Sequence, residues 1–443
     1  MLTFFGGHRG NQQSCDGVSR RDFLQVGALG FGGMMLPDVL RAEVENAARA
    51  SGKSVINIML FGGPTHMDTF DLKPDAPAEY RGEFKPIQTA VPGLDICELM
   101  PKLASVADKF TLIRSIVGMN NEHTNRQADS GWSGRSLESI GGRPGLGAVM
   151  SKVWGTSQTT SNGTSPTFVE LERSAAQERQ RASAGFLGST FDAYRPDGPG
   201  LSNLTLNSEI SLNRLHDRKS LLIGLDRIRR RVDASGMMNA MDSFTERAVG
   251  LITSGELAKA LDLKNEDPKT VARYGADKGG HSVKYLHARR LIEADVRCVT
   301  FNTTGWDTHT DNFKRCRSLV TPLDQSLSAL IEDLDARGML DDTIIMMSGE
   351  FGRTPRINAT GGRDHWPRAA FFFLAGGGMK HGQVIGSTNR LGEVAQDRPV
   401  HLQHVFTTVY KQLGIDPDTT TLFDPNGRPQ YLVENREVIP ELI

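Results

Sequence analysis

The feature that most constrains the fold is a set of short apolar segments that recur along the whole chain. Residues 54–61, 110–117, 296–301, 343–347 and 369–374 are apolar and rich in β-branched or aromatic residues. Several of them end at a glycine or a polar loop, and they have the length of buried strands rather than of helices. Near-continuous apolar strands of this kind are typical of a parallel sheet that is covered on both faces.

Helical segments lie between these strands. Residues 283–293 and 402–413 have apolar residues at helical spacing, and Thr321-Pro322 is expected to open a long helix. Four leucines would give that long helix one apolar stripe: Leu323, Leu327, Leu330 and Leu334. The alternation predicts an α/β fold, with a mainly parallel sheet and helices on both faces.

The composition excludes several other classes of protein. The chain has 443 residues, with 51 Lys and Arg against 52 Asp and Glu, for a net charge of −1. This balance gives no support to a nucleic-acid partner, which would favour a basic excess. The four cysteines lack any C-x-x-C spacing and are too few for a disulfide framework. A soluble globular protein remains.

Two segments interrupt the strand and helix pattern. Residues 212–263 have many charges and few glycines or prolines, and they predict a helical insertion within residues 205–270. Residues 156–167 are rich in Ser and Thr and are expected to form a surface loop. The chain from residue 51 to residue 443 is predicted to form a single domain, which includes this insertion.

The N-terminal segment has the features of an export signal. Arg20 and Arg21 precede the apolar run 26–36, which is too short to cross a bilayer. Two adjacent arginines before such a run indicate a twin-arginine signal over residues 1–42, with cleavage between 42 and 50. We therefore expect the twin-arginine translocase as a partner, a periplasmic or otherwise exported protein, and no membrane span after signal removal. The alternative is a basic surface patch before a buried helix.

The loops at the ends of the predicted strands carry the candidate chemistry. Ligands of open α/β sheets bind beyond the carboxyl ends of the strands, so polar residues there should converge. Five such loops carry His, Asp or Glu. Their candidate metal ligands are His66, Asp68, Asp307, His309, Glu350, Asp364 and His365, and their candidate catalytic residues are His123, Thr124 and Arg353.

Mixed imidazole and carboxylate groups suit Zn or Mn, with Ca or Mg where oxygen ligands dominate. Two such ions could clamp the attacking and leaving oxygens of a phosphoryl or sulfuryl transfer. Arg353 and Arg363 could bind the anion through bidentate hydrogen bonds. In the alternative interpretation, each histidine is only a hydrogen-bonded loop residue. His381, His401 and His404 are expected to be structural.

With these loops in view, the chain resembles the bacterial family catalogued as domain of unknown function 1501. The resemblance is carried by GGPTHMDTFD at 62–71, by residues 288–313, by residues 340–366, and by the final VFTTVYKQLGID. This family is considered a distant member of the alkaline-phosphatase and sulfatase superfamily. The resemblance therefore implies an alkaline-phosphatase-like domain with metal ligands Asp68, Asp307, His309 and His365.

The chain departs from the superfamily pattern in two places. Glu350-Phe351 stands where an Asp-His pair is expected, and there is no C-x-P-x-R or S-x-P-x-R motif for a formylglycine nucleophile. Thr124 is a candidate nucleophile and Ser115 a weaker one; otherwise a metal-activated water would attack. The resemblance implies an exported metal-dependent hydrolase of phosphate or sulfate esters, small-molecule or polysaccharide. The alternative is a non-catalytic exported binding or assembly protein that retains the fold.

Overall fold

The computed structural model describes residues 52–160, 163–171, 184–196 and 255–443. The predicted export signal lies outside the described residues, as does most of the predicted insertion. Of that insertion, the structure describes a helix at its end, α9 (Glu256–Leu261). No helix within the described ranges has the length and apolar character that a membrane span needs.

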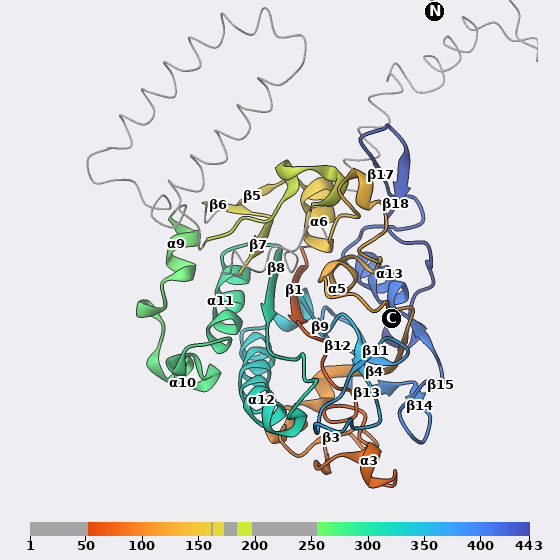
Figure 1. Cartoon of the computed structure of the whole chain (residues 1–443). Helices are drawn as coiled ribbons and strands as arrows, with labels where there is room; N and C mark the ends of the chain where they lie inside the picture. Colours follow the sequence, from red (N-terminus) through yellow and green to blue (C-terminus); the bar gives the residue numbers. More distant parts are fainter. Residues whose placement is uncertain (1–51, 161–162, 172–183, 197–254) are drawn as a thin grey trace, which may run out of the picture. The chain divides into compact units, whose positions relative to one another are not determined.

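An eight-stranded sheet forms the centre of the molecule, in the order β13-β4-β12-β9-β1-β8-β7, with β16 beside β4 (Figure 1). Its strands are β1 (Ser54–Leu60), β4 (Phe110–Val117), β7 (Phe168–Glu170), β8 (Cys298–Thr303), β9 (Thr343–Ser348), β12 (Ala370–Gly376), β13 (Gln383–Ile385) and β16 (Val400–His401). The pairs β1–β8, β1–β9, β7–β8, β13–β4 and β16–β4 are parallel. Only β12 is antiparallel to its neighbours among the described strands of this sheet. The prediction of a mainly parallel sheet is therefore confirmed.

Helices cover both faces of this sheet, as the sequence predicts. Neighbouring residues of β1 enter different cores, with Val55 on one face and Ile56 on the other. This division follows from the alternation of side chains along a strand. The helices of the first core are α4 (Pro101–Ser105), α9, α10 (Pro268–Tyr274), α11 (Ser282–Glu293) and α12 (Asn312–Ala336). The second core holds α6 (Leu146–Trp154) and α13 (Leu402–Gln412).

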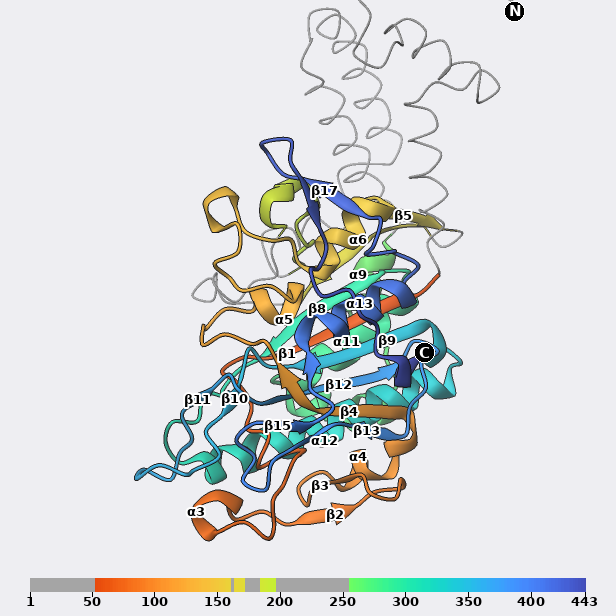
Figure 2. The same ribbon diagram turned by 90° about the vertical axis from the view of Figure 1, so that its right-hand side faces the viewer.

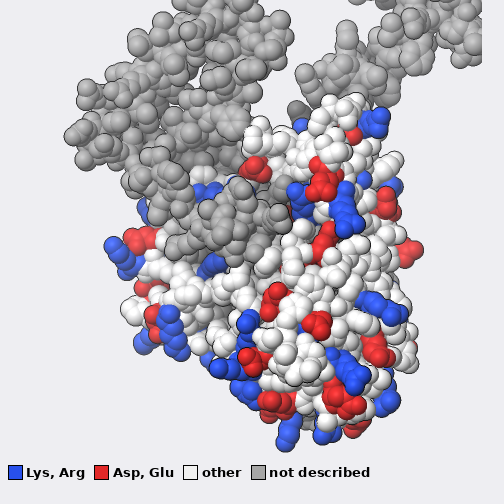
Figure 3. Space-filling view, in the orientation of Figure 1, with Lys and Arg blue, Asp and Glu red and all other residues white. Residues whose placement is uncertain are grey.

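Short elements complete the described chain. These are α3 (Ala78–Arg81), α5 (Arg126–Ser130), and the pairs β2 (Pro86–Gln88) with β3 (Asp95–Cys97), β5 (Ser157–Thr160) with β6 (Gly163–Pro166), β10 (Gly352–Arg353) with β11 (His365–Trp366), β14 (Ser387–Thr388) with β15 (Ala395–Asp397), and β17 (Thr421–Phe423) with β18 (Pro429–Tyr431). Figure 2 shows the central strands stacked side by side, with the β10–β11 hairpin at one end of them. Acidic and basic side chains are mixed over the face in Figure 3, in keeping with the charge balance.

Two local predictions were wrong. The long helix α12 begins at Asn312 rather than at Thr321, and Pro322 lies inside it. The earlier start is explained by Phe313 and Cys316, which are buried and extend the apolar face of the helix towards its N-terminus. Residues 156–167 contain the β5–β6 hairpin instead of a loop. The composition was misleading because threonine, which recurs in both strands of the hairpin, is also favoured in β-strands.

Candidate metal centre

Parallel strands bring the predicted loops to one edge of the sheet. The carboxyl ends of β1, β4, β8 and β9 meet there because these strands point the same way. Since β12 runs antiparallel to β4 and β9, the segment that precedes β12 lies at the same edge. The site therefore gathers segments that are far apart in the sequence, as the sequence analysis expected.

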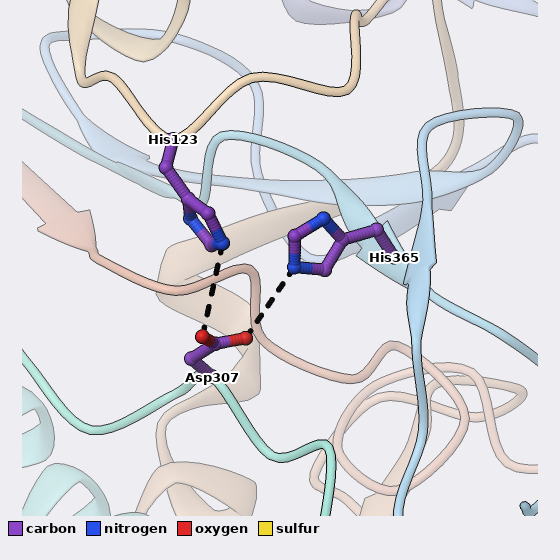
Figure 4. A group of neighbouring side chains, drawn as sticks. All are labelled: His123, Asp307 and His365. Atoms are coloured by element: carbon purple, nitrogen blue, oxygen red, sulfur yellow. Dashed lines mark ion pairs between the residues drawn. The ribbon is translucent and has the colours of Figure 1, made fainter.

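Three side chains form a candidate metal-binding group at this edge. Their ligand atoms all lie within 4.8 Å of one another, and they belong to His123, Asp307 and His365 (Figure 4). The Nε2 atom of His123 is 3.7 Å from Oδ2 of Asp307, and Nε2 of His365 is 3.4 Å from Oδ1. His123 follows β4, Asp307 follows β8, and His365 opens β11.

His309 lies directly beside this group. Its Nε2 atom is 3.0 Å from Nε2 of His365 and 3.1 Å from Oδ1 of Asp307. The carboxylate of Asp307 is therefore approached by three imidazole rings, each through its Nε2 atom.

The opposite nitrogen of each ring contacts an oxygen that can accept a hydrogen bond. Nδ1 of His123 lies 3.2 Å from Oε1 of Glu350. Nδ1 of His309 lies 2.6 Å from Oδ1 of Asp364, and Nδ1 of His365 lies 2.7 Å from Oδ1 of Asn121. Because carboxylate and amide oxygens only accept, each Nδ1 donates, and in the neutral ring the Nε2 atom keeps a lone pair.

The donor set therefore fits a divalent cation. Three Nε2 lone pairs and one carboxylate converge, and the hydrogen bonds that fix the rings are those typical of metal-binding histidines. Lone pairs that face one another at 3.0 Å, as in His309 and His365, need a proton or a cation between them. Nitrogen-rich sets favour Zn or Mn over Ca or Mg, whose preferred ligands are oxygens.

The pKa shifts of two of these groups favour the protonation states that bind a cation. Burial opposes ionisation of Asp307, but the hydrogen bond and charge of Arg353 lower its pKa below the usual range. Burial and the nearby cationic groups lower the pKa of His365 to about 4, so its ring is neutral near pH 7. The hydrogen bond to Glu350 raises the pKa of His123, and protons there would compete with a metal ion.

Arg353 contacts the group through Asp307 and is fully buried. Its guanidinium donates to the carbonyl oxygens of Gly62, Gly63 and Arg363 as well as to Oδ1 of Asp307. These partners occupy four of the five N–H donors of the guanidinium, and its burial keeps it from a substrate anion. The structure thus places Arg353 as the residue that orients Asp307, which differs from the anion-binding role expected from the sequence.

Glu350 touches the group only through His123. Its carboxylate, 1% exposed, accepts hydrogen bonds from the backbone N–H groups of Gly62 and Gly63 at 3.0–3.1 Å. Both glycines have positive φ, and a Cβ atom at Gly62 would lie 2.3 Å from the backbone nitrogen of Asp307. Glu350 therefore fixes a tight turn that only glycine can form so close to Asp307.

Asp68 is not brought into the group. Its buried carboxylate forms two hydrogen bonds with Arg363, of 2.6 and 2.9 Å, and accepts from Thr65 and Asn312 at 2.8 Å each. The other N–H groups of Arg363 donate hydrogen bonds to the carbonyl oxygens of Tyr80, Thr354 and Pro355. This ion pair joins the loop after β1 to the loop before β11, and the hydrogen bond from Asn312 adds the start of α12. The five N–H groups of Arg363 are all used, so none is left for a substrate anion.

The remaining candidates also lie outside the group. His66 is fully buried, and its Nε2 atom donates to the carbonyl of Gly392 at 2.8 Å. The hydroxyl of Thr124 accepts from the N–H of Arg126 at 3.3 Å, and that of Ser115 donates to the carbonyl of Arg398 at 2.6 Å. Asp364 holds the ring of His309 rather than joining the three ligand atoms.

Two further residues contact the ring of His365, and neither was among the candidates predicted from the sequence. Asn121 orients His365 from the same loop that carries His123, but that loop gave only His123 and Thr124 as candidates. The buried ring of Phe351 packs on His365 with centroids 4.4 Å apart and meets His123 at 5.3 Å. The sequence feature that could have pointed to Phe351 is its position directly after Glu350, just beyond the end of a strand.

A cavity of about 560 Å³ lies next to these side chains. It shares Asp364 with the site and includes the indole of Trp366, whose Nε1 atom donates to the carbonyl of Glu393 at 2.7 Å. Arg356 lines the cavity and is exposed, unlike Arg353 and Arg363. A small molecule in this cavity would therefore meet an accessible guanidinium.

Comparison with known families identifies the chain. A profile described as "Protein of unknown function (DUF1501)" matches residues 52–443, so the protein belongs to this family. The match confirms the resemblance seen in the sequence motifs. No curated protein matches the chain significantly.

Several solved structures are similar in outline. The PsFucS1 sulfatase from Pseudoalteromonas sp. is 12% identical over 86% of this chain and 71% of that chain, with a TM-score of 0.37. The C-terminal periplasmic domain of EcEptC from Escherichia coli, in complex with Zn, is 11% identical over 89% and 94%, with a TM-score of 0.37. The lipoteichoic acid synthase LtaP from Listeria monocytogenes is 11% identical over 85% and 78%, with a TM-score of 0.35. All three scores lie below 0.5, so the description of the fold rests on the sheet order itself.

Proposed function

We propose that the protein is a metal-dependent hydrolase of phosphate or sulfate esters. The observation that carries the proposal is the convergence of three imidazole Nε2 atoms on the carboxylate of Asp307. In this proposal His123, His365 and Asp307 hold one divalent cation, with His309 as a fourth ligand. Asp68, Glu350 and His66 are not ligands in this proposal. Asp68 and His66 contact protein groups elsewhere, and Glu350 reaches the group only through Nδ1 of His123.

A divalent cation held there, Zn or Mn by the donor set, would act as a Lewis acid on the ester. The protein's own residues supply the rest of the arrangement. Arg353 keeps Asp307 ionised and oriented, and Glu350, Asp364 and Asn121 hold the imidazole rings. The accessible guanidinium of Arg356 would bind the anionic group of the ester, since Arg353 and Arg363 are buried.

Turnover of aryl phosphate and aryl sulfate esters tests the proposal. Metal-loaded wild-type protein should hydrolyse at least one of the two classes, and His365→Ala should remove both turnover and metal. His404→Ala is a matched control, since His404 faces Glu437 and His401 instead of the metal-binding group. Wild-type protein that holds metal and hydrolyses neither class would overturn the enzymatic proposal and favour a binding or assembly protein.

Two further variants separate the roles within the proposal. Arg356→Gln should raise KM more than it lowers kcat, because it removes binding that is shared by substrate and transition state. Thr124→Ala tests the candidate nucleophile. Loss of turnover with metal retained would assign covalent attack to Thr124, and retained turnover would leave the attack to water.

We also propose export through the twin-arginine pathway. The proposal rests on Arg20, Arg21 and the apolar run 26–36, which lie outside the described residues. Replacing both arginines by lysine should leave the full-length chain inside the cytoplasm in a cell-fractionation experiment. Equal export of the variant and the wild type would contradict the proposal.

A further inference from the structure

The hairpin of β17 and β18 exposes aromatic side chains at the surface of the protein. Among the residues that the structure describes, three large apolar side chains are exposed: Phe423 (66%), Tyr431 (46%) and Ile443 (47%). The first two belong to this hairpin, which lies at the opposite end of the described fold from α3 (Figure 1, Figure 2). Exposed apolar side chains that gather in one place are typical of contact surfaces.

The strand pairing puts both aromatic rings on one face of the hairpin. Phe423 lies opposite Pro429, and Thr421 lies opposite Tyr431. Residues that are directly opposite, and residues two apart along a strand, share a face. The other face is covered, since Leu422 packs in the second core. An antiparallel hairpin at a surface commonly has one apolar and one polar face, so an outer face with Phe423, Pro429 and Tyr431 departs from that pattern.

Hydrogen bonds hold this outer face in a fixed shape. The buried carboxylate of Asp424 accepts from the N–H groups of Asn426 and Arg428, at 2.9 and 3.0 Å, and so fixes the turn. The Nε1 atom of Trp132 donates to the carbonyl of Leu432 at 2.7 Å and fixes the end of β18. A surface that is already ordered loses little conformational entropy when it binds a partner.

Guanidinium groups border the aromatic rings. The Cζ atom of Arg436 lies 3.8 Å from the centroid of the Tyr431 ring. Arg143 donates from Nη1 to the carbonyl of Tyr431 at 3.2 Å, and Arg428 in the turn is exposed. Glu434 is an exposed carboxylate close to Arg143. Three cations against this one exposed anion make the border of the face mainly basic.

An anionic phospholipid surface complements both parts of this face. Its phosphate groups attract guanidinium groups, and its interface takes up aromatic side chains. A second copy of the chain would bring the same arginines together, and like charges repel each other. A soluble anionic polymer would pair with the arginines but offers no apolar interior for Phe423 and Pro429.

We propose that the β17–β18 hairpin attaches the protein peripherally to anionic phospholipid. Phe423, Pro429 and Tyr431 lie at the boundary of the acyl chains in this arrangement, and the three arginines contact the phosphate groups. None of these residues belongs to the metal-binding group, so the proposal does not depend on hydrolase activity.

Cosedimentation of the full chain with vesicles tests the proposal. The protein should bind vesicles of equal parts phosphatidylglycerol and phosphatidylcholine about tenfold more tightly than phosphatidylcholine alone, because each arginine at an anionic surface contributes about fivefold. Added salt should weaken this binding, since it screens the charges. The predicted export signal also attracts anionic lipid, so variants of the hairpin decide where the protein binds.

Two matched pairs of variants identify the hairpin. Phe423→Ser should weaken binding to the anionic vesicles about tenfold, whereas Ile443→Ser, which removes another exposed apolar side chain, should leave it unchanged. Arg428→Gln should weaken binding about fivefold, whereas Arg81→Gln, which removes an exposed arginine of α3, should not. The melting temperatures should stay the same, because all four side chains are exposed.

Three results would overturn the proposal. The first is a wild-type protein that does not bind anionic vesicles, or equal binding by Phe423→Ser and Ile443→Ser. The second is self-association in sedimentation that Phe423→Ser abolishes, which would assign the face to a second copy of the chain. The third is binding to a soluble polyuronate that equals binding to the vesicles and also depends on Phe423, which would assign the face to an anionic polymer.

Discussion

Two sets of side chains at the same sheet edge are each built around an aspartate, and they differ in what surrounds it. In the first set, His123, His309 and His365 face Asp307 through nitrogen atoms that carry lone pairs. In the second, Asp68 faces Arg363, and every oxygen of the carboxylate accepts a hydrogen bond from the protein. The facing lone pairs of the first set need a proton or a cation between them, whereas the second set is complete.

This difference shows that residue type alone does not distinguish a candidate metal ligand from a structural group. Acidic residues in loops after strands look alike in the sequence, but the number of donors around each one decides its role. Asp307 receives a hydrogen bond from one buried arginine and is still 45% exposed at its side chain. Asp68 has no exposed surface and four hydrogen bonds.

The largest effect is expected for Asp68→Ala. It leaves the buried guanidinium of Arg363 without its carboxylate, and breaking a buried pair in this way costs about 3–5 kcal/mol of the free energy of unfolding. Asp364→Ala is the control, because Asp364 is half exposed and should cost under about 1 kcal/mol. Urea unfolding measures the free energy of unfolding of both variants. Equal costs would contradict the division into a structural and a metal-binding set.

A smaller loss of stability is expected for Glu350→Gln. The amide accepts less strongly from Gly62 and Gly63, and hydrogen bonds to a charged group contribute about 1.5–3 kcal/mol. Because Glu350 is not a ligand in this account, the variant should keep its metal, with affinity reduced only through the ring of His123. Loss of metal from a variant with unchanged stability would show instead that Glu350 is a ligand.

Asn121→Ala should weaken metal binding while leaving stability almost unchanged. Asn121 is exposed and holds Nδ1 of His365, and partners of this kind affect metal affinity about 10- to 100-fold. Competition with a chelator measures the affinity. An unchanged affinity would mean that His365 is oriented by its packing against Phe351 alone.

The smallest effect is a pH dependence carried by His66. Burial lowers the pKa of this histidine below 6.5, so the folded chain binds fewer protons than the unfolded chain in this range. The contribution of His66 to stability is therefore complete above about pH 6.5 and is lost as the pH falls towards its folded pKa. His66→Gln should flatten the fall of the unfolding free energy between about pH 7 and 5. A difference that grows above pH 7 would contradict this assignment.

The fold was largely predictable, because the apolar segments and their spacing in a single sequence predict where the strands and helices lie. Each of the five strand segments corresponds to a strand, and the sheet edge follows from the shared direction of four of them, since β12 is antiparallel. The start of α12 was not predictable from Thr321-Pro322, since Asn312 and Phe313 are fixed by tertiary contacts. A proline inside a helix is tolerated when such packing continues on both sides of it.

The candidate site was predictable only in outline. Strand ends marked the correct loops, but hydrogen-bond partners from other loops decide what each residue does. Arg353 reaches three backbone carbonyls that no spacing in the sequence reveals. Asn121 was not predicted, because nothing in the sequence pairs its amide with His365, which lies 244 residues further along the chain.

Metal content is the measurement that tests the central claim most directly. Elemental analysis of purified protein should find about one Zn or Mn per chain, and near zero in His365→Ala and Asp307→Ala. Asp68→Asn, if it remains folded by circular dichroism, should keep the metal of the wild type. Metal retained by His365→Ala and Asp307→Ala, or lost from folded Asp68→Asn, would contradict the claim that the two sets of side chains differ in function.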